Sequence, residues 1–348
     1  MMEDQGSVRG VDVEAVTKWF ADNVEGAKPP LEFSLIAGGH SNLTFKVTDA
    51  AKNEFVLRRP PLSHVLASAH DMGREHKIIS ALWPTPVPVP QTLGFCPTPD
   101  VNGAPFYVMR YVPGVVLHDA AIVLRSLGEK QRRANGESFV DVLADLHAVD
   151  VDAVGLGDLA KKEDYIARQL KRWYGQYQQS KTRELPAVDR VHDKLKAMIP
   201  KQEKASVVHG DYRLGNSITD PATGAISAVL DWEICTLGDP LADLGYVLAT
   251  WTQSTDPMAG TPGAPSMADG YPSREEVTER YAKRSGRDLS KIDFYVAFSQ
   301  WKSACIIEGV YARYLGGALG KTDVDLEQFK TRIESFAELA EQAVARFA

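Results

Sequence analysis

The chain has 348 residues, of which 44% are hydrophobic and 24% charged, enough apolar surface for two lobes or one large domain. Its net charge of -7 argues against nucleic acid or an anionic membrane as the main partner. The three widely spaced cysteines show neither metal-ligand spacing nor a disulfide framework, which favours a cytoplasmic location. Residues 1–10 are polar and no apolar run approaches the length of a membrane span, so no membrane association is expected.

The first third of the chain is predicted to be a small α+β domain. Val13, Val16 and Phe20 recur at helical spacing, which predicts a helix over residues 11–25. Residues 62–82 are expected to be mainly helical, after a Pro-Pro break. Short alternating runs predict five strands, at residues 31–36, 43–47, 55–58, 94–96 and 106–112.

The remainder is predicted to be mostly helical. Pro113-Gly114 marks the boundary, which gives domains at residues 1–112 and 113–348. A short strand is expected at residues 206–208, and the Pro-, Gly- and Ser-rich residues 252–272 are expected to form a mobile loop. Helices are expected at residues 137–149, within 161–199, and at 273–285, 291–316 and 323–346.

The strongest functional signal is the stretch from Val208 to Asn216, which reads Val-His-Gly-Asp-Tyr-Arg-Leu-Gly-Asn, together with Asp231 in Val-Leu-Asp-Trp-Glu. Phosphoryl transfer uses one carboxylate to orient the attacking hydroxyl, and an amide and a second carboxylate to hold Mg²⁺. Asp211, Asn216 and Asp231 supply these groups in the order and spacing of a kinase catalytic loop. Ordinary turn chemistry explains Gly215 and Asn216 but not the complete string.

This stretch resembles the aminoglycoside phosphotransferase family, whose motif is H-G-D-x-x-x-x-N followed by an apolar-Asp motif. Gly210 and Trp232-Glu233 stand where protein kinases have Arg and Phe-Gly, which favours a small-molecule kinase. The resemblance implies a protein-kinase-like α+β fold with two lobes. The N-lobe would hold a five-stranded antiparallel sheet and one main helix, and the C-lobe would be mostly helical.

The resemblance also implies a nucleotide site in the N-lobe. A loop over the phosphates would comprise Gly38, Gly39, His40, Ser41 and Asn42, although a glycine pair between strands is also typical of a plain hairpin turn. Backbone atoms of the segment containing Met109, Arg110 and Tyr111 would bind the adenine edge; the alternative is a buried strand followed by a turn.

Arg58 stands where the family has a phosphate-binding Lys, and Glu75 is its expected helix partner. Arg58-Arg59-Pro60-Pro61 resembles the branch that includes the kinase-like domain joined to some animal acyl-CoA dehydrogenases. Arg keeps the charge and suits bidentate phosphate contacts. The alternatives are an exposed strand cation for Arg58 and a solvated helix residue for Glu75.

In the catalytic half, Asp211 is the expected base or orienting carboxylate, and Asn216 and Asp231 are the expected Mg²⁺ ligands. Arg213 either neutralises the transferred phosphate or pairs with a carboxylate. ATP is the expected phosphate donor, with GTP not excluded. Structural roles are expected for the remaining polar residues of the motifs, His147, His209, Asp239 and Asp243.

The acceptor is expected to be a hydroxyl of a small molecule, bound by residues 161–199, residues 252–272 and the C-terminal helices. Lys and Arg are mixed with the acids of residues 161–199, which disfavours aminoglycosides and leaves a hydroxylated metabolite or an acyl-CoA. The alternative function is a nucleotide-binding pseudokinase, and protein kinase activity is disfavoured because an A-P-E segment is absent. Either a monomer or a homodimer is compatible with the sequence.

Overall fold

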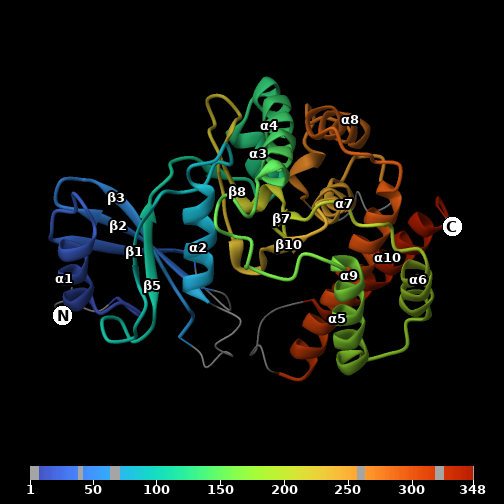
Figure 1. Ribbon diagram of the computed structural model, residues 1–348, viewed down its shortest axis with the longest axis horizontal. Helices are drawn as coiled ribbons and strands as arrows, with labels where there is room; N and C mark the ends of the chain where they lie inside the picture. Colours follow the sequence, from blue (N-terminus) through green and yellow to red (C-terminus); the bar gives the residue numbers. More distant parts are fainter. Residues whose placement is uncertain (1–7, 38–41, 63–70, 257–262, 318–324, 348) are drawn as a thin grey trace. The chain divides into compact units, whose positions relative to one another are not determined.

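A computed structural model describes residues 8–37, 42–62, 71–256, 263–317 and 325–347 (Figure 1). The chain divides into two compact units. Unit 1 comprises residues 1–114 together with Ser227–Glu233, and unit 2 comprises Val115–Ile226 and Ile234–Ala348. The segment that carries Asp231 therefore groups with the N-terminal unit, although it follows the catalytic-loop motif in the sequence.

Unit 1 is built on a five-stranded antiparallel sheet in the order β1-β2-β3-β5-β4, which confirms the predicted α+β class. Its helix α1 shares one apolar core with the sheet, where Phe20, Phe45, Leu57 and Phe106 are buried. Alternation of side chains along each strand sends one set into this core. The strands are β1 (Leu31–Ala37), β2 (Leu43–Asp49), β3 (Glu54–Arg59), β4 (Thr92–Cys96) and β5 (Phe106–Arg110).

The two helices of unit 1 begin with the same kind of cap. In α1 (Val13–Asn23) the side chain of Asp12 accepts from the N–H of Ala15, and in α2 (Met72–Leu82) Asp71 accepts from Arg74. In the described part of residues 62–82 the predicted helix spans Met72–Leu82, and residues 63–70 lie outside the described part of the chain. Helix α2 packs against β4 and β5.

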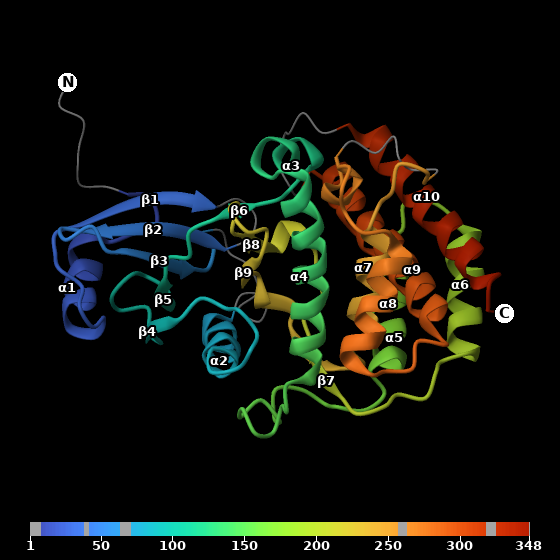
Figure 2. The same cartoon turned by 90° about the horizontal axis from the view of Figure 1, so that it is seen from above.

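Unit 2 is mostly helical, as predicted. Its long α9 packs against both α7 and α10, and α4 packs against α8 (Figure 2). The helices are α3 (Ala120–Ser126), α4 (Glu129–Ala148), α5 (Tyr165–Ser180), α6 (Pro186–Ala197), α7 (Leu241–Thr250), α8 (Arg274–Ser285), α9 (Ile292–Leu315) and α10 (Leu326–Val344). Helix α4 begins eight residues before the predicted start at residue 137, because its first two turns are polar and carry little apolar periodicity.

The short strands of the catalytic region are β6 (Val115–Val116), β7 (Ser206–Val208), β8 (Ser217–Thr219), β9 (Ile226–Val229) and β10 (Thr236–Gly238). Strand β7 pairs antiparallel with β10, so the chain returns beside the start of the catalytic loop soon after passing Asp231. The predicted loop at residues 252–272 contains a short 3₁₀ helix at Pro265–Met267, and its residues 257–262 lie outside the described ranges. In the ranges that the structure covers, no helix is long and apolar enough to cross a membrane.

Candidate active site

The catalytic loop leaves β7 through a glycine with a left-handed backbone. Gly210 has φ 88°, and a Cβ there would approach the side chain of Ile234 to 3.1 Å. An L-residue would be strained in this conformation, so the backbone turn itself requires the glycine of the His-Gly-Asp motif.

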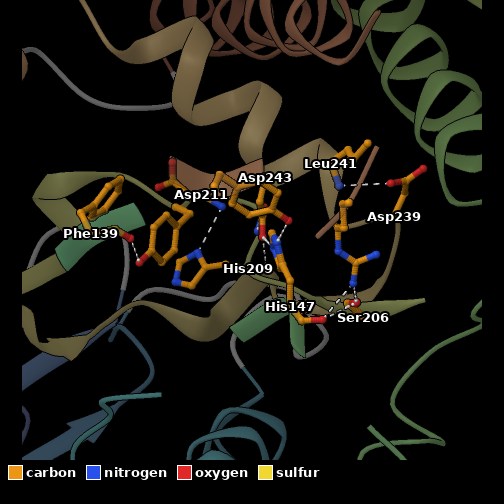
Figure 3. Close-up of polar contacts among 12 residues, drawn as sticks. Phe139, His147, Ser206, His209, Asp211, Asp239, Leu241 and Asp243 are labelled. Carbon is orange, nitrogen blue, oxygen red and sulfur yellow. Dashed lines mark hydrogen bonds and ion pairs between the residues drawn. The ribbon is translucent and has the colours of Figure 1, made fainter. Parts of the chain in front are cut away.

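One buried carboxylate fixes this turn (Figure 3). Asp243, in the first turn of α7, accepts from the backbone N–H of His209 at 2.6 Å and of Gly210 at 2.9 Å. His147 Nε2 donates to the same carboxylate at 3.4 Å, while its Nδ1 accepts from the hydroxyl of Tyr281 at 2.7 Å. Asp243 and His147 therefore lie where a structural role requires them.

The pKa shifts of His147 and Asp243 agree with these hydrogen bonds. Burial lowers the pKa of His147, so the imidazole is neutral and donates through one nitrogen only. Burial alone would raise the pKa of Asp243, but the hydrogen bonds from His147 and the loop backbone lower it below the usual range. Asp243 is thus an ionised anchor that is 1% exposed.

The carboxylate of Asp211 is held at both oxygens. Its Oδ2 accepts from Asn216 Nδ2 at 2.7 Å and from Arg213 Nε at 3.3 Å. Its Oδ1 accepts from the hydroxyl of Tyr246 at 2.6 Å. Of the two roles considered for Arg213, the structure contains the pairing with a carboxylate.

Asn216 uses its amide nitrogen twice, toward the carbonyl and the carboxylate of Asp211. This assignment of the amide leaves Oδ1 with no hydrogen bond from the described residues. The oxygen type that Mg²⁺ prefers is therefore uncommitted at this position. The described chain contains no group of three or more His, Cys, Asp or Glu residues placed to hold a metal by themselves.

In unit 1, Asp231 and Glu75 share one arginine. Arg58 donates through Nε to Glu75 at 3.2 Å, and through Nη2 to Asp231 at 2.9 Å. Glu75 is 2% exposed and the Arg58 side chain 14% exposed, so the exposed-cation and solvated-helix alternatives are wrong. Asp231 has φ 65°, a sparsely populated conformation for a residue with a side chain, and such strain is concentrated at functional sites.

The charged residues of this cluster shift one another's pKa values. Burial opposes the charge of Arg58, but Glu75, Tyr107 and Asp231 outweigh it and raise the pKa of the guanidinium. Burial raises the pKa of Glu75 above its usual range, and Arg58 only partly offsets this effect. Arg58 is therefore a permanent cation shared between two carboxylates.

The neighbouring arginine has a different environment. Arg59 Nη1 donates to the carbonyls of Gly10 at 2.6 Å and Asn102 at 3.0 Å. Successive side chains on a strand point to opposite faces, so only one arginine of the pair reaches the acidic cluster. The resemblance in the sequence predicted Arg58 as the partner of Glu75, and the structure contains this pair.

The structure describes only some of the other residues that were predicted to bind the nucleotide. Gly38, Gly39, His40 and Ser41 lie outside the described residues, and Asn42 is 4% exposed. At the end of β5, Met109 is buried, while the backbone N–H of Arg110 donates to Gln91 and that of Tyr111 donates to Glu54. The N–H groups of Arg110 and Tyr111 are thus used within unit 1, which leaves their carbonyl groups as candidates for a base contact.

A cavity of about 840 Å³ lies in unit 2. Its lining includes apolar side chains, among them Leu248, Val296 and Phe336 from α7, α9 and α10, together with acidic and basic ones. Gln300 also lines it, and its Oε1 is buried without a hydrogen-bond partner in the described structure. His118 lines the cavity, and a Cβ added at Gly215 would lie 3.2 Å from its Nδ1, so one lining residue lies near the catalytic loop.

The cavity draws on residues 252–272 and the C-terminal helices, but residues 161–199 do not line it. Those residues form α5 and α6, which pack on α9. Several aromatic residues of these segments and helices belong to the core instead: Tyr177, Trp251, Trp301 and Tyr311 are buried.

Two residues beside Asp211 were not predicted. Tyr246 lies one turn beyond Asp243 on α7, and Lys302 Nζ donates from α9 to the carbonyl of Gly210 at 3.3 Å. In the sequence Tyr246 is one of several aromatic residues in an apolar helix, and Lys302 is one cation in a long helix. Only the packing of α7 and α9 brings them to the loop.

With this geometry, the molecule combines a kinase-like catalytic loop with a five-stranded sheet that carries a buried Arg-Glu pair. The sequence model described as "Phosphotransferase enzyme family" matches residues 32–292, and the chain belongs to that family. Acyl-CoA dehydrogenase family member 10 of Mus musculus is 37% identical over 314 residues, which are 89% of this chain and 29% of that protein. This relative confirms the predicted branch, and the chain spans less than a third of its length.

A crystal structure from Ralstonia eutropha, described as a candidate aminoglycoside phosphotransferase, is similar with a TM-score of 0.83 and 34% identity. The similarity covers 96% of this chain and 98% of that one. Spectinomycin phosphotransferase in complex with ADP and spectinomycin matches over 96% and 100% of the two chains, with a TM-score of 0.62 and 13% identity. These similarities confirm the predicted protein-kinase-like fold.

Proposed function

We propose that the protein is a small-molecule kinase that moves the γ-phosphate of ATP to a hydroxyl group in a Mg²⁺-dependent reaction. The observation that carries this proposal is the state of the catalytic loop. Asp211 is held as a carboxylate acceptor, while Asn216 keeps its amide oxygen uncommitted. A loop built only as a structural turn needs neither feature.

The nucleotide would be bound by Gly38 to Asn42, by Arg58 with Glu75, and by the backbone around Met109, Arg110 and Tyr111. Asn216 and Asp231 would supply the protein oxygens for Mg²⁺, and GTP remains an alternative to ATP. When bound, Mg²⁺ neutralises charge on the phosphates and orients them. Arg58 is suited to phosphate contact because its guanidinium keeps a charge and several donors even when buried.

Asp211 would orient the acceptor hydroxyl and accept its proton, and Arg213 would lie beside the transferred phosphate. The cavity in unit 2 supports an acceptor with an apolar portion and a donor group for Gln300. A hydroxylated metabolite or an acyl-CoA is the proposed acceptor, and acidic as well as basic side chains line the cavity. We further propose a cytoplasmic protein that acts as a monomer or homodimer, without nucleic acid or membrane as partner.

Calorimetry with a non-hydrolysable ATP analogue, with and without Mg²⁺, tests the nucleotide site. The wild-type protein is expected to bind in a metal-dependent manner, and Asp231→Asn is expected to lose the metal dependence. Asp211→Asn is expected to bind as the wild type does, but to lower turnover by about 10²- to 10⁴-fold in a screen of hydroxylated acceptors, the usual contribution of a general base. Wild-type turnover in either variant would refute the assigned role.

One observation favours a second candidate, a nucleotide-binding pseudokinase. Arg58 pairs with Asp231, so a cation already engages the carboxylate proposed for Mg²⁺. The same calorimetry separates the two functions. Nucleotide binding that is indifferent to Mg²⁺, with no ADP formed from any acceptor, would favour the pseudokinase.

A further inference from the structure

The hydroxyl of Tyr246 is a fixed donor to the catalytic carboxylate. It lies 2.6 Å from Asp211 Oδ1, and the side chain comes from α7, the helix that also carries the loop anchor Asp243. Burial and the adjacent Asp211 raise the pKa of Tyr246, so the phenol remains protonated. A protonated phenol at this distance donates to the carboxylate and never competes with it for a proton.

The two oxygens of Asp211 are not equivalent. Oδ2 accepts from both Asn216 and Arg213, whereas Oδ1 accepts from Tyr246 alone among the hydrogen bonds of the described residues. A carboxylate oxygen accepts about two hydrogen bonds. One acceptor position on Oδ1 is therefore available, and the Asp211 side chain is 27% exposed.

The peptide that precedes Asp211 is also held from both sides. Lys302 Nζ donates to its carbonyl, that of Gly210, at 3.3 Å, and its N–H donates to His209 Nδ1 at 3.2 Å. The Lys302 ammonium lies 5.6 Å from the ring centre of Trp173 and 6.0 Å from that of Tyr246. These rings enclose the ammonium and limit where it can move.

We propose that Tyr246 and Lys302 are positioning residues that turn Asp211 so that Oδ1, and not Oδ2, receives the proton of the acceptor hydroxyl. Lys302 fixes the peptide plane and Tyr246 fixes the rotation of the carboxylate. This inference rests on the proposed kinase function. In the reaction, the acceptor oxygen bonds to the γ-phosphorus, its proton passes to Oδ1, and the bond from that phosphorus to the ADP oxygen breaks.

The test compares Tyr246→Phe and Lys302→Met with the wild type. Tyr174→Phe is the matched control, because it removes another hydroxyl-carboxylate bond, 2.8 Å to Asp189, away from the catalytic loop. The readouts are ADP release from Mg·ATP, with water as the acceptor, and the crystal structure of each variant. Tyr246→Phe is expected to lower kcat by about tenfold, the effect of one hydrogen bond to a charged group, with KM for ATP unchanged.

In the crystal, the Asp211 carboxylate is expected to rotate away from its wild-type orientation in Tyr246→Phe, and the Gly210 peptide is expected to turn in Lys302→Met. An unchanged Asp211 orientation, or an effect on KM alone, would overturn the positioning role. The structural readout does not depend on turnover. Absence of Mg·ATP hydrolysis in the wild type would therefore count against the kinase function, while the carboxylate orientation would still decide the role of Tyr246.

Discussion

Asp243 of unit 2 and Glu75 of unit 1 are both deeply buried carboxylates, and the two are stabilised in different ways. Asp243 of unit 2 accepts two backbone N–H groups and a neutral histidine, and its pKa is lowered. Glu75 of unit 1 relies chiefly on Arg58, and its pKa is raised. Burial is similar, so the supply of fixed donors decides the direction in which the pKa of each carboxylate shifts.

The difference has a functional meaning. Asp243 is committed to the loop backbone, and no charged side chain needs to move for it to stay ionised. Arg58 divides its donors between Glu75 and Asp231, so the balance of that cluster changes whenever an anion or cation joins it. Unit 2 thus holds its loop with fixed backbone donors, and unit 1 holds two carboxylates with one shared arginine.

Removing the rigid anchor is expected to have the largest effect on stability. Asp243→Ala leaves the N–H groups of His209 and Gly210 buried without their acceptor, and each unsatisfied group costs about 1–3 kcal/mol. The free energy of unfolding, measured in urea, is expected to fall by about 4 kcal/mol. Asp243→Asn keeps an acceptor oxygen and is the matched control. Equal losses in the two variants would mean that charge, and not backbone satisfaction, stabilises the loop.

The sequence predicted contacts of the candidate site where their geometry is local. His209 to Asn216 form one continuous motif, and strand alternation brings Arg58 rather than Arg59 to Glu75. It did not predict Tyr246 or Lys302, because their proximity to Asp211 depends on how α7 and α9 pack. The early start of α4 was also missed, since a polar helical turn has the composition of a loop.

The free energy of unfolding is expected to depend on pH when Arg58, the cation between Glu75 and Asp231, is removed. Arg58→Met leaves Glu75 buried without its charge partner, which costs about 3 kcal/mol when the carboxylate is ionised. An acid whose pKa is raised in the folded state retains its proton there, so its stabilising effect is present at low pH and is lost as pH rises through the folded pKa. The variant is therefore expected to lose more stability at pH 8 than at pH 5.

Urea unfolding at both pH values measures this difference. The double variant Arg58→Met/Glu75→Gln carries no titrating group at either position and is the control. Its own stability is expected to change less between the two pH values than that of Arg58→Met, because no group titrates at position 75. A pH-independent loss in Arg58→Met alone would show that removing the arginine does not raise the folded-state pKa of Glu75 further, which would contradict the role of Arg58 in keeping that carboxylate ionised.

The smallest effect is expected at an ion pair of good geometry that lies on the surface. Arg284 on α8 donates through Nη2 to both oxygens of Asp145 on α4, each at 2.8 Å, but its side chain is 45% exposed. Solvent screens such a pair, so Arg284→Ala is expected to cost about 0.5 kcal/mol and to lose even that in high salt. Urea unfolding at low and high ionic strength measures both quantities. A loss of stability as large as that of Arg58→Met would show that hydrogen-bond geometry matters more than burial. The expected small loss would instead show that the Arg58 ion pairs are strong because water is excluded from them.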